Sequence, residues 1–241
     1  MNNFIFLPVI FLLSLSLNID SQWVQVDEGM ENSIVQSLIN SGNNIFAGTA
    51  YDGVFLSTDN GSSWIPSLLF AINYFSLAVS GSNVLVGTGG YGIYLTTDSG
   101  GNWVQSGLNG RSVRSLATIG NFTYAGTVQS GVYRSTDNGS SWTQTSLNNQ
   151  NVYSLAVNGS SVFAGTDSNR VYLSTDDGLT WSQTINNRSS YSLAANGGSV
   201  FAGTTNISIG TGVYLSTNNG TTWSQTALNN RIVYALAVTG N

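Results

Sequence analysis

An eight-residue segment recurs five times in this chain and constrains its fold more strongly than any other feature. Every copy follows the pattern Ser/Thr-Thr-Asp/Asn-x-Gly-x-x-Trp. The copies span residues 57–64, 96–103, 135–142, 174–181 and 216–223. Their tryptophans, Trp64, Trp103, Trp142, Trp181 and Trp223, are separated by 39, 39, 39 and 42 residues. A fixed period near 40 residues with one aromatic anchor per unit is typical of a propeller or an array.

Each repeat unit carries four short runs with the pattern of β-strands. In one unit they are residues 152–157, 161–166, 170–175 and 181–184. The runs are rich in β-branched and aromatic residues and are bounded by Gly, Asn, Asp or Ser, which is the pattern of strands joined by turns. No stretch of the repeats has a helical pattern. Four antiparallel strands every 40 residues make one propeller blade, so we predict an all-β fold, a β-propeller of four-stranded antiparallel blades.

The number of repeats predicts the extent of the propeller. Complete units cover residues 33–67, 74–106, 113–145, 152–184 and 191–226. A lone fourth strand is expected at 23–26 and a lone first strand at 233–238. We therefore expect five complete blades plus partial strands at both ends, that is, a C-terminally truncated fragment of a six- or seven-bladed propeller. The Ala-Gly-Thr that ends most second strands predicts close packing near the axis, since glycine within a strand marks a close approach.

The N-terminal residues have the pattern of an export signal. Residues 4–17 are apolar apart from Ser14 and Ser16, which suits the core of a signal peptide and is short for a membrane span. We predict a signal peptide at 1–21 and a single propeller domain at 22–241. The protein would then be secreted or at the cell surface, in the periplasm or outside the cell, without membrane insertion after cleavage. A buried N-terminal segment is the alternative.

The composition excludes several classes of function. The chain has no Lys, His or Cys, and charged residues make up 7% of it. A net charge of −5 argues against binding to nucleic acid or to an anionic membrane surface. Without Cys and His there is no disulfide framework, thiol catalysis or ordinary zinc site, and we expect no metal and no cofactor.

The recurring segment has the chemistry of a tight turn. Its Asp can accept backbone N–H groups, its Gly permits a left-handed φ, and its Trp can fold back as a hydrophobic plug. Asn in the fifth copy can still accept through its amide oxygen. Besides the five tryptophans, the turn residues are Asp59, Gly61, Asp98, Gly100, Asp137, Gly139, Asp176, Gly178, Asn218 and Gly220. We expect a structural role for them, because equivalent turns on different blades cannot converge on one substrate.

The segment resembles the Asp-box, or BNR repeat, and the resemblance covers residues 23–241. Asp-box propellers include sialidases, xyloglucan-degrading hydrolases, sortilin-type receptors and photosystem II assembly factors. The resemblance implies Asp-box hairpins between the third and fourth strands of each blade. It implies no shared chemistry, since one fold carries many functions.

Candidate catalytic acids are few. The resemblance to sialidases would require three clustered arginines and a Tyr/Glu pair, but the only glutamates, Glu28 and Glu31, fall in one loop. Asp52 and Asp167 are expected in turns between second and third strands, on one rim and three blades apart. They could act as the paired carboxylates of a glycoside hydrolase. Stabilisation of their own turns is the interpretation that we favour.

Three of the six arginines recur at one position, just before the first strand of a blade. They are Arg111, Arg188 and Arg231, and Gln150 takes the place in the remaining copy. On the rim opposite the recurring turns they form a candidate binding surface for a carboxylate, a sugar acid or a peptide. Inheritance through blade duplication, without a function, is the alternative that we favour.

These observations predict an exported, non-catalytic propeller that acts as a binding or scaffold module for a protein or carbohydrate ligand. The full-length protein is expected to be monomeric. One alternative is a sialidase- or xyloglucanase-like hydrolase with catalytic residues partly beyond Asn241. Another is an assembly factor that recognises a protein through Arg111, Arg188 and Arg231.

Overall fold

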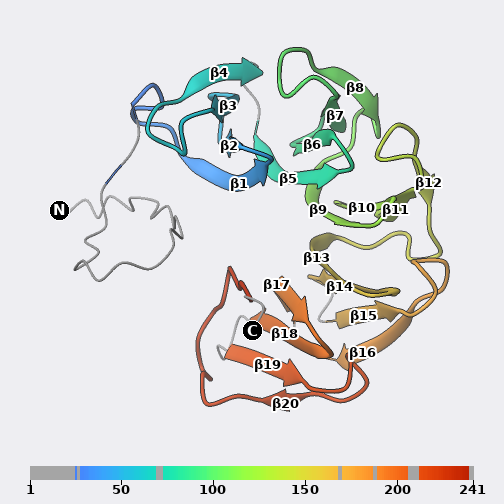
Figure 1. Ribbon diagram of the computed structural model, residues 1–241. Helices are drawn as coiled ribbons and strands as arrows, with labels where there is room; N and C mark the ends of the chain where they lie inside the picture. The colour runs from blue at the N-terminus through green and yellow to red at the C-terminus, as the bar shows by residue number, and fades with distance from the viewer. Residues whose placement is uncertain are drawn as a thin grey trace.

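The computed structural model describes residues 25, 28–68, 73–167, 170–186, 189–205 and 212–238, without the side chains of Asn186 and Thr205. The predicted signal peptide at 1–21 lies outside the described residues, as does the predicted strand at 23–26 apart from Gln25. The described part of the chain is all-β and contains no helix. It forms five four-stranded antiparallel sheets, each with its strands in chain order (Figure 1).

Each sheet is one blade, formed by four consecutive strands. Blade 1 contains β1 (Val35–Ser41), β2 (Asn44–Thr49), β3 (Val54–Ser57) and β4 (Ile65–Leu68). Blade 2 contains β5 (Tyr74–Ser80), β6 (Asn83–Thr88), β7 (Ile93–Thr96) and β8 (Val104–Gly107). Blade 3 contains β9 (Val113–Ile119), β10 (Phe122–Thr127), β11 (Gly131–Ser135) and β12 (Thr143–Gln144). Blade 4 contains β13 (Val152–Asn158), β14 (Ser161–Thr166), β15 (Arg170–Ser174) and β16 (Ser182–Asn186). Blade 5 contains β17 (Ser189–Asn196), β18 (Ser199–Thr205), β19 (Gly212–Ser216) and β20 (Ser224–Gln225). The prediction of five complete blades is confirmed.

The blades follow one another in an arc, with the first strand of each blade innermost (Figure 1). Each innermost strand contacts the next one along the arc, in the order β1, β5, β9, β13 and β17. The predicted crowding is present at the second strand. A Cβ on Gly126 would lie 2.7 Å from Cγ1 of Val152 in the next blade, which is closer than carbon atoms can pack.

The hydrophobic core is divided into layers between successive blades. One layer contains Phe46, Val54 and Leu68 of blade 1 together with Tyr74 and Val84 of blade 2. Every described sheet is therefore apolar on at least one face, and an inner blade is apolar on both. This explains why the strands carry nearly continuous apolar runs rather than a strict alternation.

The predicted strand at 233–238 is wrong. These residues are described without regular secondary structure, because no described strand pairs with their backbone. They nevertheless take the place of a sixth innermost strand. The Ser192 hydroxyl donates to the carbonyl oxygen of Val233 at 3.2 Å, and Val233 lies over Gly203 as Val152 lies over Gly126.

The recurring turn joins the third and fourth strands of every blade and is closed by its own side chains. In blade 3, Oδ1 of Asp137 accepts hydrogen bonds from the Ser135 hydroxyl at 2.7 Å and the Ser141 N–H at 2.8 Å. Its Oδ2 accepts from the Ser141 hydroxyl at 2.6 Å. The Gly139 N–H donates to the Ser135 hydroxyl at 2.8 Å. These bonds lower the pKa of Asp137 to about 2, with the Ser141 hydroxyl as the largest cause.

The backbone of this turn is left-handed at two successive residues. Asn138 has φ 55° and Gly139 has φ 87°, and the same pair of positions is left-handed in the other four copies. Sequence reasoning assigned this conformation to the glycine alone. The residue before it is Asn or Asp in four copies, and these side chains tolerate the left-handed region better than most.

The turn tryptophan packs against the preceding blade as well as its own hairpin. Trp142 of blade 3 lies against the core layer that contains Leu85 of blade 2, and its indole N–H donates to the Gly139 carbonyl at 3.1 Å. Trp103 meets Phe46 of blade 1 edge to face, with ring centroids 6.2 Å apart. In blade 1, Trp64 is instead covered by Met30 from the segment before β1. The turn tryptophan therefore also contributes to the packing between consecutive blades.

Candidate binding face

The turns between second and third strands lie beside the segments that lead into the first strands. In blade 2 the Gly92 N–H donates to the Arg111 carbonyl at 3.0 Å, and in blade 5 the Gly212 N–H donates to the Arg231 carbonyl at 2.8 Å. The two sets of loops therefore share one rim, as the sequence predicted. The recurring turns occupy the opposite rim, where Asn138 accepts from the Ser80 hydroxyl in a hairpin of blade 2 at 3.0 Å.

The structure places two of the three predicted arginines on this rim. Arg111 is half-buried, donates to the Ser130 hydroxyl at 2.5 Å and lies 5.3 Å from the Tyr133 ring centroid. Arg231 is exposed, and Arg188 lies outside the described residues. Arg111 and Arg231 belong to different blades, and Arg111 is engaged by side chains of blade 3. The described arginines at this repeat position therefore differ in exposure and in contacts.

The two predicted rim carboxylates occupy turns of blades 1 and 4. Asp52 is exposed, and its N–H donates to the Thr49 hydroxyl at 3.1 Å. Asp167 is half-buried and accepts from the Asn151 amide at 2.7 Å through Oδ2. Its carbonyl oxygen accepts from the Ser189 hydroxyl at 2.8 Å. The contacts of Asp167 tie its turn to the segments that lead into β13 and β17.

A row of residues on the same rim was missed by sequence reasoning. Each first strand begins with a β-bulge, where the pairing with the second strand skips one residue. The skipped residues are Gln36, Phe75, Arg114, Tyr153 and Tyr191. Tyr234 takes the equivalent place next to Val233. We call these six residues the bulge row. A β-bulge re-aims the side chain of its extra residue, and bulges are common beside functional sites.

From Phe75 to Tyr234, neighbouring side chains of the bulge row interact from blade to blade. The Arg114 guanidinium lies 3.8 Å from the Phe75 ring centroid and 5.9 Å from that of Tyr153. The ring centroids of Tyr153 and Tyr191 are 5.1 Å apart, and those of Tyr191 and Tyr234 are 6.2 Å apart. The part of the row from Phe75 to Tyr234 is thus a continuous band of aromatic rings with one guanidinium inserted, along the innermost strands of the arc.

The bulge row combines aromatic side chains with the single charged side chain of Arg114. Burial raises the pKa of Tyr191, and neighbouring Tyr153 adds to the effect, so the Tyr191 phenol remains neutral at physiological pH. Nε of Arg114 is buried and has no hydrogen-bond partner. Tyr234 is 71% exposed, and Gln36 at the other end is also exposed. Aromatic faces can stack on a sugar ring or an apolar side chain, and the guanidinium can pair with a carboxylate.

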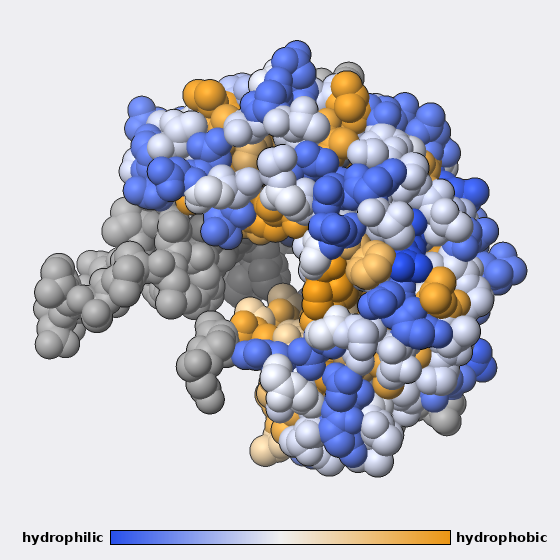
Figure 2. All heavy atoms as spheres, turned by 45° about the vertical axis from the view of Figure 1, so that its right-hand side comes forward, coloured by the Kyte–Doolittle hydropathy of each residue, from blue (hydrophilic) through white to orange (hydrophobic). Residues whose placement is uncertain are grey.

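The surface view agrees with this arrangement. Hydrophilic residues cover most of the outer surface, whereas apolar residues border the hollow in the middle of the molecule (Figure 2). Large exposed apolar side chains include Ile232 at 50% and Leu228 at 52%, both in the segment that precedes Val233.

One signal in the sequence could have identified the bulge row. When the repeats are aligned, the bulge-row position itself is variable, whereas the residue that follows it is Ser in five of six copies. The variable residue is Gln, Phe, Arg, Tyr, Tyr or Tyr. Strict strand alternation would have placed it on a face between blades. Only the bulge, a tertiary feature, exposes it on the rim.

Five four-stranded blades arranged around an axis define the protein as a β-propeller, and solved structures share this fold. An ancestral GH74 enzyme matches 86% of this chain and 33% of its own, with a TM-score of 0.69 and 24% identity. The Niastella koreensis GH74 enzyme matches 79% of this chain and 38% of its own, with a TM-score of 0.65 and 21% identity. YCF48 bound to D1 peptide matches 84% of this chain and 70% of its own, with a TM-score of 0.65 and 15% identity.

These likenesses show the fold alone, since related propellers differ in chemistry. The chain spans about a third of the length of the ancestral GH74 enzyme. No family model and no curated protein matches the sequence. Among the described residues, no helix is long and apolar enough to cross a membrane. In the same part of the chain, no three acidic side chains gather as metal ligands would.

Proposed function

We propose that this protein is an exported, non-catalytic β-propeller of the Asp-box type that binds a protein or carbohydrate ligand. The signal peptide at 1–21 would direct its export, and residues 22–241 would form the binding domain. The ligand would lie across the rim that carries the bulge row. Asp52, Asp167, Arg111, Arg188 and Arg231 would border it, and Asp52 and Asp167 would stabilise their turns rather than catalyse.

The continuous aromatic band of the bulge row carries this proposal. Neighbouring rings 5.1 to 6.2 Å apart offer a surface for an extended ligand rather than a single small molecule. Tyrosine suits this role because it combines a large apolar face with a hydroxyl and loses little conformational freedom on binding. One structural neighbour is consistent with ligand binding by this fold, since YCF48 was solved with a bound D1 peptide.

A binding screen with matched variants tests the proposal. The purified protein is applied to an array of neutral and acidic polysaccharides and to an array of peptides, and hits are quantified by calorimetry. Tyr153→Ala and Tyr191→Ala should each weaken binding about three- to tenfold through the loss of stacking. Val104→Ala, which changes an exposed residue on the outer strand β8, should leave the affinity unchanged.

The same screen distinguishes the alternatives. Equal affinity of the tyrosine variants and the unaltered protein for the hits would contradict binding at the bulge row. Release of shortened oligosaccharides from a polysaccharide hit, abolished by Asp52→Asn or Asp167→Asn, would establish the hydrolase alternative. Binding of a peptide that depends on Arg111 and Arg231 but not on the tyrosines would favour the assembly-factor alternative.

A further inference from the structure

One blade departs from the repeat at a core position of its third strand. Four blades carry Leu there, and blade 3 carries Arg134. The four leucines are Leu56, Leu95, Leu173 and Leu215. An arginine that replaces a repeated leucine costs apolar packing, so repeat inheritance does not account for it. The other four blades provide internal controls for what this position does structurally.

The residue opposite Arg134 departs from the repeat as well. Tyr124 in β10 is the register partner of Arg134, where the other blades carry Phe or Leu. Tyr124 is fully buried, and its hydroxyl has no hydrogen-bond partner. Burial raises its pKa to about 12, and the nearby Arg134 charge opposes this shift. Because the raised pKa keeps the Tyr124 phenol neutral, this phenol provides no negative charge beside the Arg134 guanidinium.

The guanidinium of Arg134 is positioned but not satisfied. Its Cζ atom lies 4.4 Å from the Phe122 ring centroid, so the aromatic ring supports the position of the guanidinium. Its Nε is buried and has no hydrogen-bond partner. A buried donor without a partner costs free energy, and the other N–H groups of the guanidinium can donate to a ligand in the pocket that Arg134 lines.

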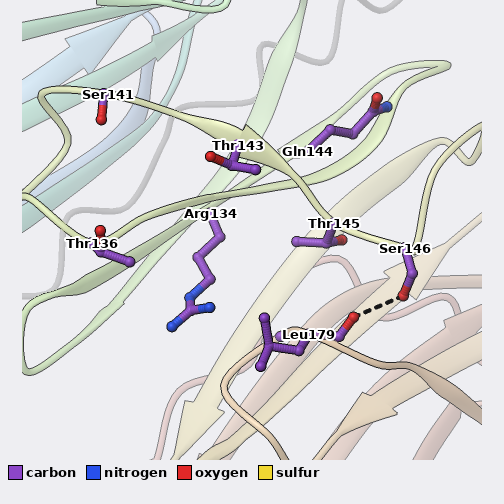
Figure 3. A pocket seen from close by; sticks show the side chains of 9 residues that line it. Arg134, Thr136, Ser141, Thr143, Gln144, Thr145, Ser146 and Leu179 are labelled. Carbon is purple, nitrogen blue, oxygen red and sulfur yellow. Dashed lines mark hydrogen bonds between the residues drawn. The ribbon is translucent and has the colours of Figure 1, made fainter.

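Arg134 reaches a pocket of about 250 Å³ between blades 3 and 4. In Figure 3 its side chain extends below Thr136 and Thr143 toward Leu179, which belongs to the recurring turn of blade 4. The Ser146 hydroxyl donates to the Leu179 carbonyl at 2.9 Å and joins the two walls (Figure 3). Leu179 is 59% exposed and is the only apolar residue at its position among the five turns.

The residues that line this pocket determine which chemical groups a ligand must carry to bind there. A guanidinium presents a fork of N–H donors that matches a carboxylate in a bidentate manner. The hydroxyls of Thr136, Thr143 and Thr145 can exchange hydrogen bonds with ligand hydroxyls. The Leu179 side chain offers an apolar wall for the C–H face of a ring. The volume lies just below the usual range for drug-sized ligands and suits a single sugar ring.

We propose that this pocket binds a hexuronic acid, with the sugar carboxylate on the Arg134 guanidinium and the sugar ring against Leu179. The site lies at the third and fourth strands and is separate from the bulge row. It therefore does not depend on the function proposed above. Either a free uronate or a uronate residue of an acidic polysaccharide presents this chemistry.

Titration calorimetry with D-glucuronate and D-galacturonate on the purified protein tests the site, with glucose and inorganic phosphate as comparison ligands. At least one uronate should bind about tenfold or more tightly than glucose and phosphate, because the site pairs a charge with ring contacts. Arg134→Leu, which installs the residue of the other four blades, should weaken uronate binding about tenfold or more. Arg170→Leu removes an exposed arginine outside the pocket and should leave binding unchanged.

A second variant distinguishes the loss of uronate binding from the loss of the native fold. Leu179→Asp alters an exposed side chain and should abolish uronate binding by charge repulsion while the circular dichroism spectrum stays native. Uronate binding that survives both variants would overturn the proposal, and so would the absence of uronate binding. Equal binding of phosphate would show a plain anion site, and equal binding of glucose would show that Arg134 does not contribute. Titration with oligogalacturonate then distinguishes a site for free uronate from a site for an acidic polysaccharide, since a polysaccharide site should bind the oligomer more tightly than the monomer.

Discussion

At the scale of the residue, Asp59, Asp98, Asp137 and Asp176 each close a turn as ionised carboxylates. Hydrogen bonds lower the pKa of each from the ordinary 3.8 to about 2, with the side chain four residues later as the largest cause. Asn218 reproduces most of this geometry without a charge. Its Oδ1 accepts from the Thr222 N–H at 2.9 Å and its Nδ2 donates to the Thr222 hydroxyl at 2.8 Å.

The lowered pKa values predict acid sensitivity. Because the folded-state pKa lies below the unfolded one, the stabilisation is complete above about pH 4 and is lost as the pH falls toward 2. The thermal unfolding midpoint, followed by circular dichroism, should therefore drop most steeply between these values. Asp137→Asn should make this drop shallower and change the midpoint little at neutral pH. Asp137→Ala should lower the neutral midpoint by about 2–4 °C through lost hydrogen bonds.

Asp52→Asn provides the matched control, because Asp52 is an exposed carboxylate outside the recurring turns. It should leave the midpoint unchanged. A midpoint that stays constant from pH 4 to pH 2 would contradict the assigned role of the carboxylates. An Asn variant as unstable as the Ala variant would contradict the equivalence with Asn218.

At the scale of the element, each recurring turn also serves as a contact between blades. Gly139 in blade 3 faces Leu85 in the second strand of blade 2, and Gly220 in blade 5 faces Phe163 of blade 4 in the same way. The glycine is therefore required twice, for its left-handed backbone and for the space that the preceding blade fills. Sequence reasoning identified the first requirement only.

The double requirement predicts different costs for two glycine substitutions. Gly139→Ala introduces a Cβ that overlaps Leu85 at a residue with φ 87°, so it should destabilise by about 2–4 kcal/mol. Gly159→Ala, in the β13–β14 turn with φ 58°, meets no atom within 4 Å and should cost about 1–2 kcal/mol. Urea unfolding of both variants measures the difference. Equal costs would show that backbone strain alone matters and that the blade contact tolerates a methyl group.

At the scale of the whole molecule, the extensive contacts between described strands of different blades join neighbours along the arc, as in other repeat proteins. The outer faces of the first and fifth blades are less well covered than the faces between blades. In blade 1, Leu38 is 37% exposed, whereas its counterparts Leu77 and Leu193 are 8% exposed. In blade 5, Phe201 is half-buried, whereas its counterpart Phe163 is fully buried.

This arrangement predicts a gradient of local stability. Backbone amides of β10 and β14 should exchange with deuterium about tenfold or more slowly than those of β2 and β18, because burial on both faces raises the cost of local opening. Hydrogen exchange followed by mass spectrometry on peptides from each strand measures this. The strands compared are equivalent second strands, which controls for local sequence. Uniform protection across the blades would show that the described molecule opens as one unit.

Most of the architecture was predictable because its causes are local. The turn hydrogen bonds of Asp137 join residues at most four positions apart, and β-strand patterns recur in every unit. The binding face was predictable in part. The sequence placed Arg111 and Arg231 on one rim but could not show that Arg111 is engaged by Ser130. It also treated residues 233–238 as a strand, although strand formation depends on a partner.

The blade, its repeat and the chemistry of its turns can be derived from the sequence, since these features follow from short-range hydrogen bonds and apolar periodicity. Which side chains of different blades come into contact depends on the tertiary structure. The band from Phe75 to Tyr234 depends on bulges that bring residues about 40 positions apart into contact. The environment of Arg134 depends on the next blade, whose turn places Leu179 across the pocket. Contacts between repeats have no local signature, because each requires the positions of two separate blades.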